Sequence, residues 1–224
     1  MNDLQQMAQE KSVLRWGGLA GILGGILFML VFVIVAVFVG DPGGVERFPE
    51  IRAARTAENG GYLLVLILWV AHFLALYVAL RRTRLAPALF GSGLGILGLA
   101  VLAAGALPHV ATVPLSDLYH GPGATPADQA ALTLMWQATW GIFDALLFTG
   151  LAIVAVGLTL LGIAMLGTPA FGRGFGWLGL VIGGLGIAAG VVLLVDPGSS
   201  IAVISVLSLI VFHISVGWKV YRVS

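Results

Sequence analysis

The chain has no cysteine and few charged residues, and these two scarcities exclude several classes of protein. Without cysteine it can contain no disulfide, no thiolate nucleophile and no cysteine-ligated zinc or iron–sulfur cluster. Only 9% of its residues are charged and 59% are hydrophobic, whereas a soluble domain carries about 25% charged residues. The net charge of +1 gives no indication of a nucleic-acid partner. The composition therefore indicates a membrane protein with several helical spans, in contact with the lipid bilayer.

Catalytic motifs are also absent. The sequence contains no Gly-x-Ser-x-Gly, His-Glu-x-x-His, Walker A or Rossmann fingerprint. The glycines between Gly91 and Gly95 lie inside a hydrophobic run, where they favour helix packing over phosphate binding. Apart from Asp128 at the start of the fourth helix, Asp144 is the only acid within the predicted spans, which excludes the paired aspartates of an intramembrane aspartyl protease. We therefore expect a protein that is not an enzyme.

Long hydrophobic runs predict an all-α transmembrane bundle of six spans. A polar segment over residues 1–15 precedes a single transmembrane domain over residues 16–222. The first hydrophobic run is too long for a signal-peptide core and no small-x-small cleavage site follows it, so we interpret it as a retained span. The approximate spans are 16–39, 61–81, 88–108, 126–166, 175–195 and 200–220.

The fourth of these helices is predicted to project from the membrane. Thr125, Pro126 and Asp128 are typical of a helix start, and Gly167 is a suitable end. At about 1.5 Å per residue this helix is about 60 Å long, whereas the hydrocarbon layer is about 30 Å thick. We expect residues 145–166 to cross the membrane and the preceding half to protrude. The alternative, two short spans divided at Gly150, gives seven spans but places no polar turn between the halves.

Basic residues predict the orientation. Arg47, Arg52 and Arg55 lie on one side of the predicted bundle, and eight Lys and Arg residues lie on the other. The positive-inside rule then places both termini in the cytoplasm, and we expect a bacterial inner-membrane protein. Those eight residues are Lys11, Arg15, Arg81, Arg82, Arg84, Arg173, Lys219 and Arg222.

Two loops are expected on the opposite side. In the first, residues 49–58 are predicted to form a short surface helix that ends at Asn59-Gly60-Gly61. Such a helix is typical of a solvated surface, and a docking surface for a partner is the alternative. The second, residues 109–127, is rich in proline and glycine and is predicted to be a rigid connection.

Glycines recur about every four residues in the first, third and fifth spans, which places them on one helix face. Such faces serve internal packing and homo-oligomer formation equally well. The second and sixth spans share a further pattern: His72 precedes Arg81 by nine residues, and His213 precedes Arg222 by nine. We hypothesise three repeated helical hairpins, the alternative being convergence of membrane hairpins on similar compositions. The glycines concerned are Gly17, Gly21, Gly25, Gly91, Gly95, Gly98, Gly172, Gly176, Gly179, Gly183, Gly186 and Gly190.

This layout resembles a known family. The glycine-rich odd-numbered spans, the long fourth span that contains tryptophan and the Gly176-Trp177 pair that opens the fifth span are similar to a six-span bacterial membrane family. That family is catalogued only as a domain of unknown function. The resemblance covers about residues 12–222 and implies no catalytic residue.

A polar stripe in the projecting half of the fourth helix is the first candidate site. Thr133, Gln137, Trp140 and Asp144 follow one another at helical spacing. Because ionisable groups in a span are costly, Asp144 is a candidate proton or cation site in a polar cavity. The alternative interpretation is a hydrogen bond between helices.

Histidines provide the other candidates. His72 and His213 lie within spans and are candidate haem or metal ligands, although their predicted depths differ by several Å. Hydrogen bonding between helices is the simpler interpretation. His109, Asp117 and His120 lie within twelve residues of one another and are candidate ligands for zinc or copper.

These features leave three hypotheses of function. The first is a non-enzymatic accessory, scaffold or sensor component that needs no cofactor. Its partner, a protein or a second copy, would bind the glycine-rich faces or the outer half of the fourth helix. The second is an ion-coupled or small-solute carrier that uses Asp144. The third is a haem- or metal-binding membrane protein.

Overall fold

The computed structural model describes residues 3–40, 44–196 and 199–224, and within these ranges it is helical with no strand. Six helical segments there are long and apolar enough to cross a membrane. The chain is thus a polytopic α-helical bundle, as predicted. In order, the elements are α1 (Asp3–Ile34), the π-helical turn η1 (Val35–Val39), the 3-10 turn η2 (Val45–Arg47), α2 (Phe48–Leu80), α3 (Leu85–Ala104), α4 (Ala106–Tyr119), α5 (Pro126–Leu166), α6 (Gly172–Val195) and α7 (Ile201–Arg222).

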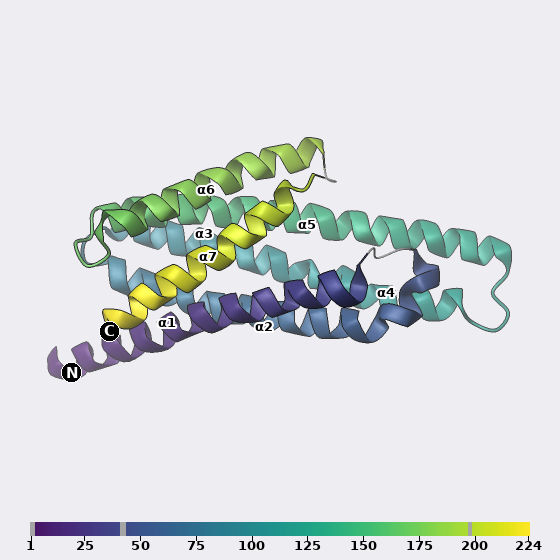
Figure 1. The fold of residues 1–224 in the computed structure, drawn as a ribbon, viewed down its shortest axis with the longest axis horizontal. Helices are drawn as coiled ribbons and strands as arrows, with labels where there is room; N and C mark the ends of the chain where they lie inside the picture. The colour runs from purple at the N-terminus through teal and green to yellow at the C-terminus, as the bar shows by residue number, and fades with distance from the viewer. Residues whose placement is uncertain (1–2, 41–43, 197–198) are drawn as a thin grey trace.

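The helices form two layers of three. In one layer α1 lies between α2 and α7, and in the other α5 lies between α3 and α6 (Figure 1). Contacts within each layer are more extensive than those between layers. The last hairpin is therefore not a tight pair, because α6 packs chiefly on α5 and α7 on α1. The repeat hypothesis stays a prediction.

Glycines make the close approaches within each layer. A Cβ atom added to Gly157 of α5 would lie 2.7 Å from the Gly91 carbonyl oxygen of α3. One added to Gly162 would lie 2.7 Å from the Leu180 nitrogen of α6, and one added to Gly217 of α7 would lie 2.9 Å from Gly18 O of α1. Without side chains these backbones meet directly, which is how helices associate in lipid. These glycines thus serve packing within the chain.

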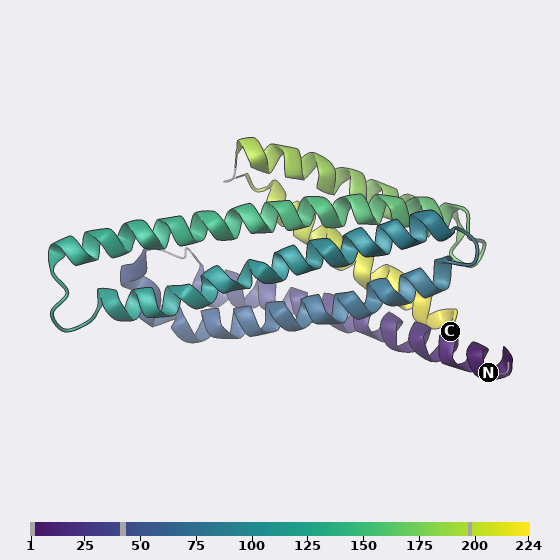
Figure 2. The same cartoon turned by 180° about the vertical axis from the view of Figure 1, so that it is seen from behind.

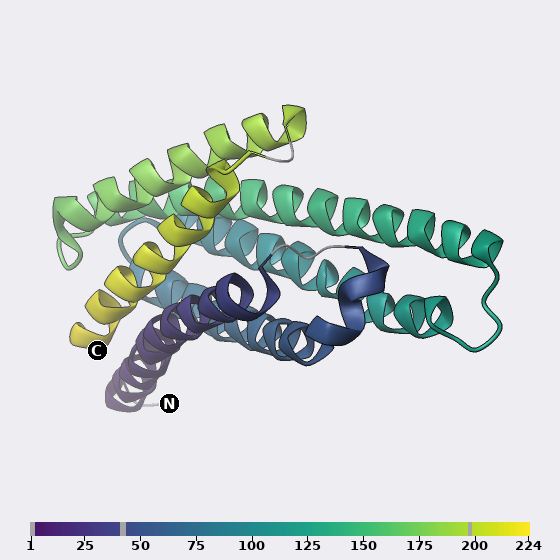
Figure 3. The ribbon, with the colours of Figure 1, turned by 45° about the vertical axis from the view of Figure 1, so that its right-hand side comes forward.

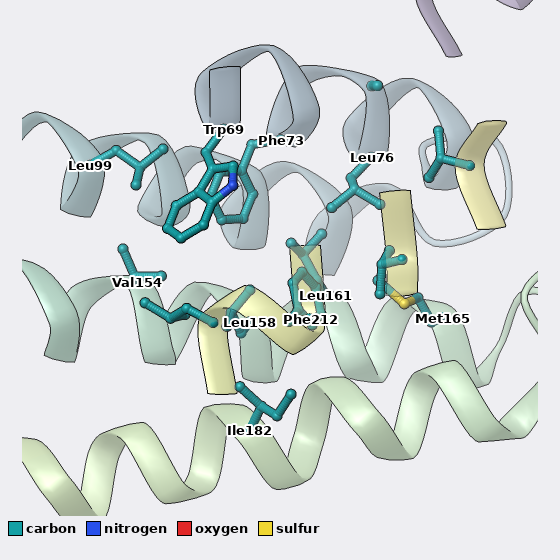
Figure 4. Close-up of a cluster of buried hydrophobic side chains, with 14 of the residues drawn as sticks. Trp69, Phe73, Leu76, Leu99, Val154, Leu158, Leu161, Met165, Ile182 and Phe212 are labelled. Carbon is teal, nitrogen blue, oxygen red and sulfur yellow. The ribbon is translucent and has the colours of Figure 1, made fainter. Parts of the chain in front are cut away.

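The core between the two layers is built from large apolar side chains. Trp69 and Phe73 of α2 face Val154 and Leu158 of α5, and Phe212 of α7 closes the cluster (Figure 4). All five are fully buried. This core lies well inside the part of the bundle where all six long helices run side by side.

One end of the molecule holds both termini, the turn after α2 and the turn after α5 (Figure 1). We call it the terminal end. Three tryptophans near it, Trp16, Trp177 and Trp218, are largely exposed, as is typical of an aromatic belt at a membrane surface. α1 begins at Asp3, so the polar residues from Asp3 to Arg15 are part of the same helix as the first predicted span.

The fourth span is one continuous helix. The Thr125 side chain accepts a hydrogen bond from the Asp128 backbone N–H, and the Asp128 carboxylate accepts one from the Thr125 N–H. This capping box starts α5 as predicted, and Gly167 follows its last residue. The division at Gly150 is excluded, since α5 runs unbroken through it.

The first half of α5 packs against other helices, whereas the sequence predicted that it would protrude by itself. Two predictions were wrong: the helix over 49–58 does not end at Asn59-Gly60-Gly61, and residues 109–119 are helical. Instead α2 continues from Phe48 to Leu80, and α4 continues the direction of α3 beside α5 (Figure 2). The bend between α3 and α4 is explained by Pro108, which has no N–H to donate to the Ala104 carbonyl.

We call this projecting part the outer bundle: residues 45–60, α4 and residues 126–144 of α5. It extends beyond the outer ends of α6 and α7 (Figure 3). It has a small core of its own, in which the Phe48 and Trp136 rings meet edge to face with their centroids 5.3 Å apart. Ile51 and Leu115 complete that core from α2 and α4.

Candidate functional site

Two histidines that are far apart in the sequence, His72 of α2 and His213 of α7, meet in the main core. The His72 and His213 ring centroids are 5.2 Å apart, so the two side chains pack directly against each other. Nδ1 of His72 donates to the Gly17 carbonyl oxygen at 2.9 Å. The His213 ring stacks on Trp69, with centroids 3.9 Å apart. His72 and His213 are both fully buried.

This arrangement does not fit a haem held between the two imidazoles. Trp69 covers one face of the His213 ring, and Phe73 and Phe212 pack against it in edge-to-face geometry. A porphyrin would have to displace these buried rings. A hydrogen bond to α1 holds His72, and ring packing alone holds His213. Nε2 of His72 and both nitrogens of His213 have no hydrogen-bond partner among the described residues.

A second polar cluster lies where the outer bundle joins the spans. Arg55 Nη1 and Glu58 Oε2 are 2.8 Å apart, and both side chains are nearly buried, 11% and 13% exposed. The Arg55 guanidinium also lies over the Trp140 ring, 5.0 Å from its centroid. His109 of α4 stacks on Phe143 at 4.4 Å. An ion pair, an imidazole and two aromatic rings thus meet from α2, α4 and α5.

A largely apolar cavity of about 210 Å³ opens beside this cluster. Glu58, Tyr62 and His109 form its polar side. The remaining walls come from α1, η1, α5 and the start of α7: Phe28, Val31, Phe32, Val35, Phe143, Leu147, Ala202, Val203 and Val206. We call it the boundary pocket.

The polar side of the boundary pocket presents hydrogen-bond acceptors. Tyr62 donates its hydroxyl proton to the Leu102 carbonyl oxygen at 3.2 Å, which leaves the phenol oxygen as an acceptor. Glu58 carries a carboxylate, and Nε2 of His109 has no partner among the described residues. Because Arg55 neutralises Glu58, this side has acceptors but no net charge. Such a pocket suits a neutral donor attached to an apolar chain.

Residues 60–221 match the family described as "Domain of unknown function (DUF4386)". That match spans more than half of the 224 residues. The chain belongs to the DUF4386 family. No curated protein and no solved structure matches it. The resemblance drawn from the glycine-rich spans is thereby confirmed over residues 60–221, a shorter stretch than the expected 12–222.

In this DUF4386 protein the predicted polar stripe lines one surface hollow. Thr133, Gln137, Trp140 and Asp144 share it with Gly44, Trp136 and Gly141, and its volume is about 530 Å³. Asp144 is partly exposed and lies on the outside of α5. The hollow therefore opens at the surface of the outer bundle, and none of its lining residues comes from the terminal half of the spans.

The three candidate metal ligands of the second loop are not brought together. His109 packs between Trp140 and Phe143, whereas Asp117 forms an ion pair with Arg52 at 2.8 Å. The His120 ring nitrogens lie 2.9 Å from Ser116 O and 3.2 Å from Glu46 O. Within the described ranges, no three His, Cys, Asp or Glu residues are placed to share a metal ion.

Sequence reasoning missed Arg55, Glu58 and Tyr62 as members of one site. Arg55 and Glu58 are three residues apart and Tyr62 follows after four more, which is the spacing of one helix face. The signal was present, but the expected helix end at Asn59-Gly60-Gly61 separated Tyr62 from the other two. Since α2 is continuous, the three residues lie together.

Proposed function

We propose that this protein is a non-enzymatic membrane component of the sensor or accessory type, and that it binds a neutral single-chain amphiphile in the boundary pocket. The observation that carries the proposal is the pocket itself, with its apolar walls and acceptor-lined side. The absence of catalytic motifs supports a binding role over an enzymatic one. Binding of this kind requires no cofactor.

The size and lining of the pocket define the ligand class. A volume of about 210 Å³ is below the range of about 300–1,000 Å³ for drug-sized ligands, so it suits one hydrocarbon chain. A hydroxyl head group would donate to Glu58, Tyr62 or His109. A carboxylate head group has no hydrogen to donate to these acceptors, and no Lys or Arg among the described lining residues would offset its charge. The preferred ligand is therefore a long-chain or isoprenoid alcohol.

Binding of tritiated 1-dodecanol to the purified protein, measured by scintillation proximity in mild detergent, tests this proposal. We expect saturable binding that unlabelled dodecanol displaces at least tenfold better than dodecanoate or dodecylammonium. Val203→Trp fills the pocket from α7 and should weaken binding at least tenfold. Val211→Trp, at an exposed position further along α7, is the matched control and should bind as the wild type does.

Three results would contradict the proposal: no saturable binding to the wild type, equal binding by Val203→Trp, or stronger displacement by dodecanoate. The thermal midpoint of each variant, measured in the same detergent, separates loss of the pocket from loss of the fold.

The proposed setting is a bacterial inner membrane with both termini in the cytoplasm. Support comes from the basic residues, which gather at the terminal end, and from the positive-inside rule. The outer bundle and the boundary pocket then lie on the periplasmic side. Protease cleavage of a site inserted between Pro122 and Gly123 in intact spheroplasts tests this; protection of that site would contradict it.

Asp144 favours a second candidate function, a proton- or cation-coupled carrier. It lines the outer hollow with Gln137 and Thr133, as a substrate-facing carboxylate would. Asp144→Asn should then abolish coupled uptake into proteoliposomes while the protein stays folded. Unchanged flux in that variant would eliminate the carrier hypothesis.

A further inference from the structure

The beginning of α1 and the end of α7 lie together at the terminal end (Figure 1). A second hollow lies between them. Its volume is about 660 Å³. Lys11, Ser12, Arg15, Trp16 and Leu19 line it from α1, and Tyr221 and Ser224 line it from the other side. It is far from the boundary pocket, at the opposite end of the spans.

The two cations in this hollow have no carboxylate partner among the described residues, in contrast to their neighbours. Glu10 binds both arginines of the turn after α2: its carboxylate is 2.6 Å from Arg81 Nη2 and 2.8 Å from Arg82 Nη2. Lys11 and Arg15 are four residues apart, so they share one face of α1. Arg15 lies over the Tyr221 ring, 5.9 Å from its centroid, which orients the guanidinium at the hollow.

An apolar stripe leads from the hollow along α1. Leu19, Leu23, Ile26 and Leu30 follow at helical spacings of four, three and four, and the last three are about half exposed. From Leu19 to Leu30 the rise is about 16 Å, which is close to half of the about 30 Å hydrocarbon thickness. Trp16, 70% exposed, stands where the basic and apolar surfaces meet. The stripe is therefore about as long as an acyl chain in one leaflet of the bilayer.

We propose that this surface is a binding site for an anionic phospholipid. Lys11 and Arg15 bind the phosphate and head group in the hollow, and one acyl chain lies along the stripe from Leu19 to Leu30. A basic cluster beside the membrane surface attracts anionic lipid. A free phosphate uses the hollow but not the stripe, so the stripe favours lipid as the source of the phosphate.

Native mass spectrometry of the purified full chain tests the site. Dioleoyl phosphatidylglycerol and dioleoyl phosphatidylcholine are added in separate titrations, because they share their acyl chains and differ in charge. We expect one retained phosphatidylglycerol at concentrations at least tenfold below those needed for phosphatidylcholine. The double variant Lys11→Gln/Arg15→Gln should lose that preference.

The matched control is Arg173→Gln/Lys219→Gln, which removes two charges at the same end outside the hollow. It should keep the preference. The proposal is overturned if the wild type binds both lipids alike, if the Lys11/Arg15 double variant keeps its preference, or if equimolar inorganic phosphate displaces the lipid. An unchanged thermal midpoint confirms that the double variant is folded. Dodecanol binding in the boundary pocket is a separate measurement, so either proposal can fail alone.

Discussion

The spans and the outer bundle are packed by different chemistries. Between the spans, glycines bring backbones together: a Cβ on Gly98 would lie 2.7 Å from Val154 N, and one on Gly157 2.7 Å from Gly91 O. In the outer bundle, aromatic rings fill the same role. Phe48, Trp136 and Trp140 pack there, while a Cβ on Gly60 or Gly141 would meet no atom within 4 Å.

The contrast follows from the solvent on each side. Lipid chains are as apolar as leucine, so burying leucine between helices in a membrane gains little, and close backbone contact supplies the attraction. Where water surrounds a bundle, each buried aromatic ring removes a large apolar area from it, and the aromatic core of the outer bundle fits such surroundings. One chain thus uses two packing rules, and the boundary pocket lies where they meet.

Breaking the glycine packing should have the largest effect. In Gly157→Leu the new side chain would start 2.7 Å from both Gly91 O and Gly95 N, so α3 and α5 must separate. We expect no folded protein after detergent extraction, judged by size-exclusion chromatography. Gly93→Leu, where a Cβ would meet no atom within 4 Å, should elute as the wild type does. If the two variants eluted alike, the proposed role of the glycines in helix packing would be refuted.

Breaking the aromatic packing should affect the outer bundle alone. Trp136→Ala removes a buried ring from the small core, at a cost of about 3–5 kcal/mol. We expect faster amide hydrogen exchange in residues 45–60 and 106–119, with the spans unchanged. Trp177→Ala, at an exposed position, should leave exchange in the outer bundle unaltered. Loss of protection throughout the spans would show that the two regions fold as one unit.

The boundary between the regions can be tested through two ion pairs of α2, one within the helix and one to α4. Glu58→Gln leaves the nearly buried Arg55 unpaired. We expect the free energy of unfolding to fall by about 3 kcal/mol, the usual cost of breaking a buried ion pair. Arg52 and Asp117 are about half exposed, 47% and 56%, so Asp117→Asn should cost about 1 kcal/mol or less. The thermal midpoints of the two variants, measured in the same detergent, compare these losses. Equal shifts of the thermal midpoint would contradict the difference in burial between the two ion pairs.

The smallest effect is expected at the terminal end, outside the hydrocarbon layer. Arg81 and Arg82 hold the pKa of Glu10 below its ordinary value by hydrogen bonds and charge. A lowered pKa stabilises the folded state above the ordinary glutamate value of about 4.3, and this contribution disappears as the pH falls through the lowered value. Glu10→Gln should thus reduce the thermal midpoint slightly at pH 7, and the difference should vanish towards pH 3. A difference that grows on acidification would contradict this sign.

Some features follow from local sequence and were predictable. The six spans follow from the length of the apolar runs. The start of α5 follows from Thr125 and Asp128, because a capping box needs only residues three apart. The local sequence did not predict how far α2 and α4 extend into the outer bundle. Asn59, Gly60 and Gly61 are poor helix formers, but packing against α1 and α4 overrides that preference, and a Cβ on Gly61 would lie 2.7 Å from Val31.

The sequence by itself determined the number of membrane helices, the projecting α5 and the end of the molecule at which cations gather, because apolar length, caps and charge are local properties. Tertiary structure alone decided which helices share a layer, and therefore which side chains meet. His72 contacts His213, and Glu58 and His109 line one pocket, although more than fifty residues separate the members of each pair. No spacing along the chain encodes these arrangements. They depend on the direction in which each helix turns its faces, which is set when the glycine-lined backbones pack together.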